Sequence, residues 1–271
     1  MASLAEVYAR ESARAGGAWH AYVTAAGQEL VARDADRVVR AGSVQKLAVA
    51  VALLDKVDRG ELALEQRLEL TAPIVAPGSG TYRLQAAYGD RLTLANLLVA
   101  MLQVSDNTAV RMLGRVLPGP EVNEILAAKG FAATRVRPLA LDPHRFWLGT
   151  TTPRETHALL TGLAGQTLLS AGATAAMLRV LRWTAVGYTD GVRRLMSSAE
   201  RDRVAAKHAA DGDLRHEVGV VFDRTGAPAL TFALFADGLG DRHNYGGTHP
   251  AVLAHAALGR AMLDLVDSVT A

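Results

Sequence analysis

The chain lacks several features that mark familiar classes of protein. It contains no cysteine, which excludes disulfide bonds, thiol catalysis and zinc–thiolate sites. Its longest apolar run, residues 47–54, is too short to span a bilayer. Its 29 basic and 27 acidic residues nearly balance, and no dense Lys/Arg cluster interleaved with aromatics predicts nucleic-acid binding. We therefore expect neither a membrane nor a nucleic acid as partner.

The N-terminus also lacks the apolar core of a signal peptide, because charged residues interrupt it at Glu6, Arg10, Glu11 and Arg14. A cytoplasmic location is the expectation, and a removed leader is the alternative. The 271 residues are half hydrophobic, which is enough for one large domain or two closely packed ones.

The order of predicted elements is strands, helices, strands and a final helix. Apolar spacing predicts a helix over 4–15, and a glycine turn separates two short strands before residue 43. Helical patterns dominate from residue 44 to about 195. Strands return at 203–209, 216–223 and 230–238, and the chain closes with a helix over 249–266.

This order predicts an α/β (α+β) fold with an antiparallel sheet built from both chain ends and flanked by helices. The sheet domain comprises residues 1–43 and 197–271. An all-helical insertion, residues 44–196, forms the second domain, and the active site is expected in the cleft between them.

The first candidate for chemistry is Ser43 with Lys46, at the start of an apolar helix. Positions i and i+3 share a helix face, so the amine can reach the hydroxyl. A lysine whose pKa is lowered by burial can take the proton of a serine and make it a nucleophile. Alternatively, Ser43 is an N-cap and Lys46 a surface lysine with its ammonium in water.

The second candidate is the sequence Ser105, Asp106 and Asn107, which separates two apolar helices. Ser105 can relay a proton to a leaving group, and the Asn107 amide can hold a substrate carbonyl. Alternatively, the three residues only cap a helix junction, a position that Ser, Asp and Asn favour.

Taken in order, S-x-x-K at a helix start and S-D-N some sixty residues later resemble the serine β-lactamase and penicillin-binding-protein superfamily, class A in particular. The stretch "GTTTPRETHALL" is similar to the start of the helix that follows the omega loop of that family. The last two strands and the closing helix also fit, so the resemblance covers roughly residues 15–268. It implies an acyl-enzyme on Ser43, with Lys46 as base and Ser105 as proton relay.

The third motif of that family, Lys-Thr-Gly, is altered. Lys207, His208 and Ala209 stand in its place, so the resemblance implies Lys207 as the charge for an anionic substrate group. His208 either contributes to substrate binding or is an ordinary strand histidine. Ala210 and Ser43 are expected to offer backbone N–H groups as the oxyanion hole. If the register slips, Asp211 and Gly212 occupy this site instead.

The omega-loop region is also altered. The matching stretch, "TRVRPLALDPHRFWLGTTTP", is shorter and contains no glutamate. Asp142 is its only acid, and it is either the base for deacylation or a turn residue before proline. Without such a base, an acyl-enzyme persists or passes its acyl group to something other than water.

Several further residues carry weaker signals. Tyr82 corresponds to a loop at the mouth of the family's cleft, where it either stacks on substrate or is a loop aromatic. Trp147 has the packing role in the shortened loop. Gly-Ser-Gly at 78–80 lacks the context of a phosphate-binding loop. Asp241, His243 and His249 fit no metal signature, and the mechanism requires no metal or cofactor.

The sequence therefore predicts a β-lactamase-like serine hydrolase. Its expected substrate is a small amide, ester or lactam that carries a carbonyl and an anionic group. The alternatives are a cytoplasmic acyl-transferase of a small-molecule pathway, with little β-lactamase activity, and a non-catalytic binding protein on the same fold.

Overall fold

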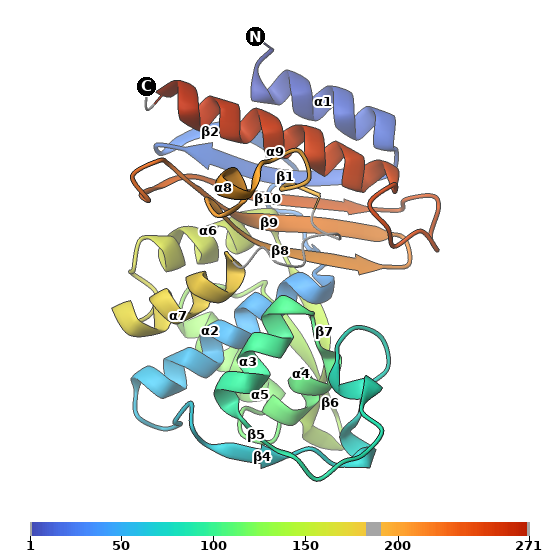
Figure 1. Cartoon of the computed structure of the whole chain (residues 1–271), viewed down its shortest axis with the longest axis vertical. Helices are drawn as coiled ribbons and strands as arrows, with labels where there is room; N and C mark the ends of the chain where they lie inside the picture. The colour runs from blue at the N-terminus through green and yellow to red at the C-terminus, as the bar shows by residue number, and fades with distance from the viewer. Residues whose placement is uncertain (1, 183–190, 270–271) are drawn as a thin grey trace.

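The chain is organised around a five-stranded antiparallel sheet that takes strands from both of its ends (Figure 1). The structure is a computed structural model that describes residues 2–182 and 191–269. The strands lie in the spatial order β2 (Gln28–Arg33), β1 (Ala18–Ala25), β10 (Pro228–Asp237), β9 (Leu214–Phe222) and β8 (Val204–Asp211). The predicted α/β class and the predicted sheet are confirmed, and β8 is one edge of that sheet.

Strand β10 joins the two ends of the chain, because it pairs with β1 on one side and with β9 on the other. All nine residues of β9 are buried. A strand is buried on both of its faces when elements cover both sides of the sheet. The sheet therefore separates two cores.

The first core lies between the sheet and helices α1 (Leu4–Ala15) and α9 (Pro250–Val269), which run side by side over one face (Figure 1). Helix α1 starts with a capping box in which Ser3 accepts a hydrogen bond from the Glu6 amide. Helix α9 starts at Pro250, within one residue of the predicted start. Apolar side chains of both helices meet Trp19, Phe232 and other residues of the sheet.

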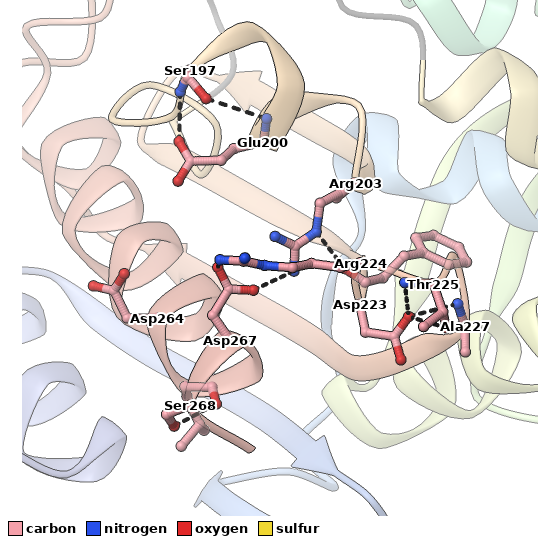
Figure 2. A network of polar contacts seen from close by, with 12 residues as sticks. Ser197, Glu200, Arg203, Asp223, Arg224, Thr225, Ala227, Asp264, Asp267 and Ser268 are labelled. Atoms are coloured by element: carbon pink, nitrogen blue, oxygen red, sulfur yellow. Dashed lines mark hydrogen bonds and ion pairs between the residues drawn. The ribbon is translucent and has the colours of Figure 1, made fainter. Parts of the chain in front are cut away.

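A polar network ties the far end of α9 to the sheet (Figure 2). Arg203 and Arg224 each donate to the carboxylate of Asp267, at 2.7 and 3.0 Å. In the turn between β9 and β10, Asp223 accepts hydrogen bonds from the backbone of Thr225 and Ala227. These contacts fix the end of α9 against the start of β8 and the β9–β10 turn.

The second core lies on the opposite face of the sheet and belongs to the insertion. Its helices are α2 (Gln45–Asp58), α3 (Leu94–Gln103), α4 (Asn107–Leu113), α5 (Gly119–Ala128), α6 (Pro153–Ala164) and α7 (Ala171–Leu181). The short α8 (Ser198–Arg201) follows them in the chain and pairs with α9 through Glu200 and Arg260. Thr93 caps α3, and Thr152 caps α6 with Pro153 in its first turn. Residues 183–190, within the stretch predicted to be mostly helical, lie outside the described residues. The domain boundaries stay a prediction.

The expectation of an all-helical insertion is wrong in one respect, because residues 44–196 also contain strands of two small sheets, one of which takes a further strand from before residue 44. Strands β4 (Arg67–Glu69) and β5 (Arg91–Thr93) form one of them, and β3 (Val39–Arg40), β7 (Asp142–Thr151) and β6 (Arg135–Leu139) form the other. The stretch expected to form a shortened omega-type loop is therefore a β-hairpin. The sequence pattern did not predict these strands, because proline residues argue against a strand and because part of the pairing is with a distant segment of the chain.

The part of the chain that the structure describes contains no helix that is both long and apolar enough to cross a membrane.

Candidate active site

Ser43 lies in a 3₁₀ turn, Gly42–Val44, that leads into α2. The N-cap interpretation of Ser43 is wrong, because α2 begins at Gln45 and its N-cap residue makes no side-chain capping bond. Gly42 has φ of +50° and lies against β8, where a Cβ would be 3.1 Å from the Cβ of Ala209. A glycine at this position lets the turn approach the edge strand closely.

The backbone before Ser43 is held from two sides. The Ala41 amide donates to the Gly149 carbonyl of β7 at 2.9 Å. On the other side, His216 of β9 contacts the Arg40 carbonyl through Nε2, at 2.9 Å, and its Nδ1 accepts a hydrogen bond from the Ala236 amide. Because Nδ1 accepts, Nε2 must carry the hydrogen and donate. The Arg40 side chain pairs with Asp213 at 2.6 Å.

Burial lowers the pKa of His216 to about 3, so its ring is neutral at any ordinary pH. The neutral ring links β10 to the backbone three residues before Ser43. Sequence reasoning missed this residue, because its contact joins positions that are 176 residues apart.

Lys46 is fully buried, so the alternative of a surface lysine is wrong. Its Nζ lies 3.1 Å from Ser43 Oγ, 3.0 Å from Ser105 Oγ and 2.7 Å from Asn107 Oδ1, and it also contacts the main-chain oxygen of Ser105. The i, i+3 relation in the sequence therefore places amine and hydroxyl in contact.

The neighbours of Lys46 suit a neutral amine. The Ser105 carbonyl and Asn107 Oδ1 can only accept hydrogen bonds, so they take both N–H groups of a neutral lysine. The remaining lone pair is then available to the hydroxyl of Ser43 or Ser105. The orientation of the Asn107 amide follows from its other side, where Nδ2 donates to the Pro77 carbonyl at 2.9 Å.

The electrostatics favour the same protonation state. Burial, and then the positive charge of Lys207, hold the pKa of Lys46 well below its usual value, while Asp106 opposes this shift. A neutral Lys46 is the form that can take a proton from Ser43.

Ser105 lies between the two lysines. Its Oγ is 3.0 Å from Lys46 Nζ and 3.2 Å from Lys207 Nζ. Its backbone has φ of +55°, an uncommon conformation for a residue with a side chain. Strained backbone of this kind is frequent at functional sites.

Asp106 fixes the loop that carries Ser105 and is also the N-cap of α4, so the capped-junction interpretation is correct for this residue. One carboxylate oxygen accepts from the Ala109 amide, and the other accepts from the amides of Thr81 and Tyr82. A Cβ on Gly80 would lie 2.3 Å from the Asp106 carboxyl carbon. The glycines at 78 and 80 thus allow the 76–82 loop to lie directly against the S-D-N sequence.

Lys207 lies on β8 with 2% of its surface exposed, and it donates to Ser105 Oγ and to the His208 carbonyl. Burial lowers its pKa to about 7, although Glu217 opposes the shift. In the alternative register, Asp211 and Gly212 would take this position, but they lie where β8 turns into β9.

The other predicted binding residues are less central. His208 and Ala210 alternate with Lys207 on β8 and are half-buried. Ala210 follows Ala209, which touches the Ser43 turn, so both expected oxyanion-hole amides belong to neighbouring segments. Tyr82 packs against the core of the insertion, and its hydroxyl approaches the Asn96 carbonyl at 3.5 Å.

Asp142 was expected to be either the base for deacylation or a turn residue, and the structure shows a turn residue. It starts β7 at the tip of the hairpin, and its carboxylate accepts from the His144 amide. Gly149, which bonds to the Ala41 amide, is seven residues further along the strand, or roughly 20 Å. Asp142 is therefore too far away to activate water at Ser43. Among residues 2–182 and 191–269, no carboxylate hydrogen-bonds to Ser43 or Lys46.

Arg215, opposite Ala210 in the sheet, is buried and donates to the carbonyls of Gly212, Leu214 and Asn244, with Tyr245 over its guanidinium. The described residues contain no group of three or more potential metal ligands.

Comparisons with known proteins identify the family and the fold of this chain. The chain matches the family described as "Beta-lactamase enzyme family" over residues 2–266. The crystal structure of a β-lactamase from Sphaerobacter thermophilus is 26% identical, with a TM-score of 0.81 over 98% of this chain and 97% of that chain. A mutant of PBP-A, in an acyl-enzyme complex with penicillin-G, is 19% identical, with a TM-score of 0.76 over 96% of each chain, and supports the fold alone.

In sequence, β-lactamase VEB-1 of Pseudomonas aeruginosa is 27% identical over 107 residues. That match spans 39% of this chain and 36% of the length of VEB-1. The fold is that of the serine hydrolases and penicillin-binding proteins related to class A β-lactamases. This chain belongs to the β-lactamase enzyme family.

Proposed function

We propose that the protein forms an acyl-enzyme on Ser43 with a small amide, ester or lactam and releases the acyl group slowly to water. The observation that carries this proposal is the contact of buried Lys46 with both Ser43 and Ser105, without a carboxylate at either atom in the described part of the chain. The acyl-enzyme of a PBP-A mutant with penicillin-G is a precedent on the same fold.

In the first step, neutral Lys46 takes the proton of Ser43 as its Oγ attacks the carbonyl carbon. The N–H groups of Ser43 and Ala210 stabilise the oxyanion. The proton passes from Lys46 to Ser105, which is 3.0 Å away, and from Ser105 to the leaving group as the scissile bond breaks. Lys207, when protonated, attracts an anionic group of the substrate.

The deacylation step distinguishes a serine hydrolase, the leading hypothesis, from an acyl-transferase, its alternative. A hydrolase needs a base that deprotonates water beside the ester carbonyl. The hairpin that replaces the omega-type loop carries only Asp142 as an acid, at its far tip. Slow hydrolysis, with faster transfer to an amine or alcohol acceptor, is therefore the favoured outcome. The cytoplasmic location stays a prediction.

Burst kinetics test this proposal. With an activated ester, we expect one equivalent of leaving group to appear quickly, followed by a slow steady rate. Hydroxylamine or an amino acid amide should raise the steady rate without changing the burst, because it replaces water as acceptor. A Ser43→Ala variant should show neither phase. A rapid steady rate that ignores the added amine would contradict slow hydrolysis.

A further inference from the structure

The β6–β7 hairpin presents an uncompensated basic surface next to the active site. Arg135, Arg137 and Arg145 are exposed, and none of them forms an ion pair with a described residue. The single carboxylate of the hairpin, Asp142, lies at its tip. The positive charge of this surface is thus available to a ligand.

The two faces of the hairpin differ. On the inner face, Pro138 and Phe146 lie against Gly119 of α5, at distances of 3.0 and 3.1 Å from the position of a Cβ there. On the outer face, Arg137 lies directly opposite Trp147, and cross-strand partners share a face. Arg145, two residues before Trp147, is exposed as well, in the irregular part of β7 that precedes Phe146.

Trp147 is 50% exposed, so half of its surface faces solvent, and its packing role stays a prediction. The partly exposed indole ring, opposite Arg137 and two residues from Arg145, offers a flat face for stacking, and the two guanidinium groups, which form no ion pair with a described residue, offer forks of hydrogen-bond donors. Guanidinium groups match the geometry of phosphate oxygens, and indole rings stack on planar rings.

This surface borders the Ser43 site from two directions. Trp147 is two residues, or about 7 Å, from Gly149, which bonds to the Ala41 amide. Arg111 lies one helical turn after Asn107, which accepts a hydrogen bond from Lys46. Burial, and then the charge of Arg145, lower the pKa of Arg111. The hairpin and α4 therefore bring four arginines and one tryptophan to the vicinity of the reacting group.

We propose that the outer face of the hairpin, with Arg137, Arg145 and Trp147 at its centre, binds a nucleoside diphosphate group carried by the substrate or the acyl acceptor. The proposal rests on the function proposed above and names the class of molecule that Ser43 serves. The two arginines hold the phosphates, Trp147 stacks on the base, and the acyl carbonyl or the accepting amine extends to Ser43.

Titration calorimetry on the full chain at low salt tests this proposal, with inorganic phosphate, pyrophosphate and ADP as probes. We expect pyrophosphate to bind more tightly than phosphate, and ADP more tightly again. The double variant Arg137→Gln/Arg145→Gln should weaken both pyrophosphate and ADP by about tenfold or more. The control Arg14→Gln/Arg179→Gln removes the same charge from exposed positions on α1 and α7 and should change affinity less than about twofold.

Trp147→Ala separates ring stacking from charge. It should weaken ADP by about tenfold and leave pyrophosphate almost unchanged, and Trp147→Phe should restore most of the ADP affinity. Absence of saturable binding, or equal losses in the control variant, would overturn the proposal. Tighter binding of a short RNA than of ADP, with the same arginine dependence, would also overturn it in favour of a nucleic-acid surface.

The Ser43→Ala variant keeps the two proposals distinguishable. It should bind ADP as the parent protein does, because Ser43 is not part of the hairpin. If acylating probes never label Ser43 but ADP still binds through the arginines, the acyl-enzyme proposal fails and the hairpin site stands as a binding site only.

Discussion

Two polar clusters in this chain hold positive charge in opposite ways. At the end of α9, Arg203 and Arg224 both bind the carboxylate of Asp267, and all three side chains keep part of their surface in water. At the active site, Lys46 and Lys207 are almost completely buried, and the atom between them is the hydroxyl oxygen of Ser105.

The physical consequences differ accordingly. A partly exposed arginine–carboxylate contact costs little desolvation and adds modest stability. A buried amine without a bonded carboxylate costs stability in its charged form and shifts to neutral instead. The first cluster stabilises the fold, while the second lowers stability and, in the proposed mechanism, supplies a base.

The largest expected effect is at Lys46. Replacing it with methionine should slow acylation of Ser43 by about 10²- to 10⁴-fold, because the general base is lost. The same change should raise the free energy of unfolding by about 1 kcal/mol or more, since an uncompensated buried amine disappears. Stopped-flow acylation and urea unfolding measure the two quantities. A Lys46→Met protein that is less stable than the parent and is acylated at the normal rate would contradict both expectations.

Loss of the Ser105 hydroxyl should affect the acylation rate differently for substrates with different leaving groups. In Ser105→Ala, acylation by a lactam or amide should fall by about 10²-fold, because the departing nitrogen needs a proton. Acylation by an ester with a good leaving group should fall far less, since that group leaves as an anion. Equal losses with both substrates would assign Ser105 to structure rather than to proton transfer.

The proposed role of Lys207 predicts that the acylation rate depends on pH. Because its pKa is lowered to about 7, acylation by carboxylate-bearing substrates should decline as the pH rises through about 7. A neutral ester should not show this decline, and Lys207→Met should remove the difference between the two substrates. Parallel pH profiles for both substrates would contradict the assigned role.

The same lowered pKa predicts a slope in stability. Between pH about 7 and the unfolded value near 10.4, the unfolded chain binds a proton that the folded chain does not, so stability rises with pH. Lys207→Met should flatten that rise, as measured by urea unfolding at pH 7 and pH 9. A rise that persists unchanged in the variant would show that other groups cause it.

Much of the active site could be predicted from the sequence, because its relations are local or belong to recognisable motifs. The spacing of Ser43 and Lys46, the S-D-N sequence and the strands at both ends of the chain all carry such patterns. The hairpin could not be predicted, because its strands contain Pro138 and a bulge near Gly149, and its partners are distant in sequence. The support of the Arg40 carbonyl by His216 is equally long-range.

A matched pair of glycines tests the loop that Asp106 holds. Gly80 and Gly89 both have strongly positive φ, +120° and +116°, but only a Cβ at residue 80 would meet other atoms. Gly89→Ala should cost about 1 kcal/mol through backbone strain alone. Gly80→Ala should cost more and should also slow acylation, because it displaces Asp106 and with it Ser105. Similar stability and activity in the two variants would refute this role of the loop.

The smallest effect is expected in the surface cluster. Arg203, and then Arg224, hold the pKa of Asp267 down to about 2, so its contribution is complete above the unfolded value near 3.9 and is lost as the pH falls towards 2. Asp267→Asn should therefore cost about 1 kcal/mol or less at pH 7, less in acid, and should leave acylation unchanged. Urea unfolding at pH 7 and pH 3 measures the loss of stability at the two pH values. Slower acylation in Asp267→Asn would contradict the view that the Asp267 cluster serves stability alone.

The most direct test of an acyl-enzyme on Ser43 is intact-protein mass spectrometry after incubation with a penicillin, a cephalosporin and an activated ester. We expect one covalent adduct per chain, absent in Ser43→Ala, that persists in buffer and disappears faster when an amine acceptor is added. No adduct with any probe, or an adduct that survives the Ser43→Ala change, would contradict an acyl-enzyme on Ser43.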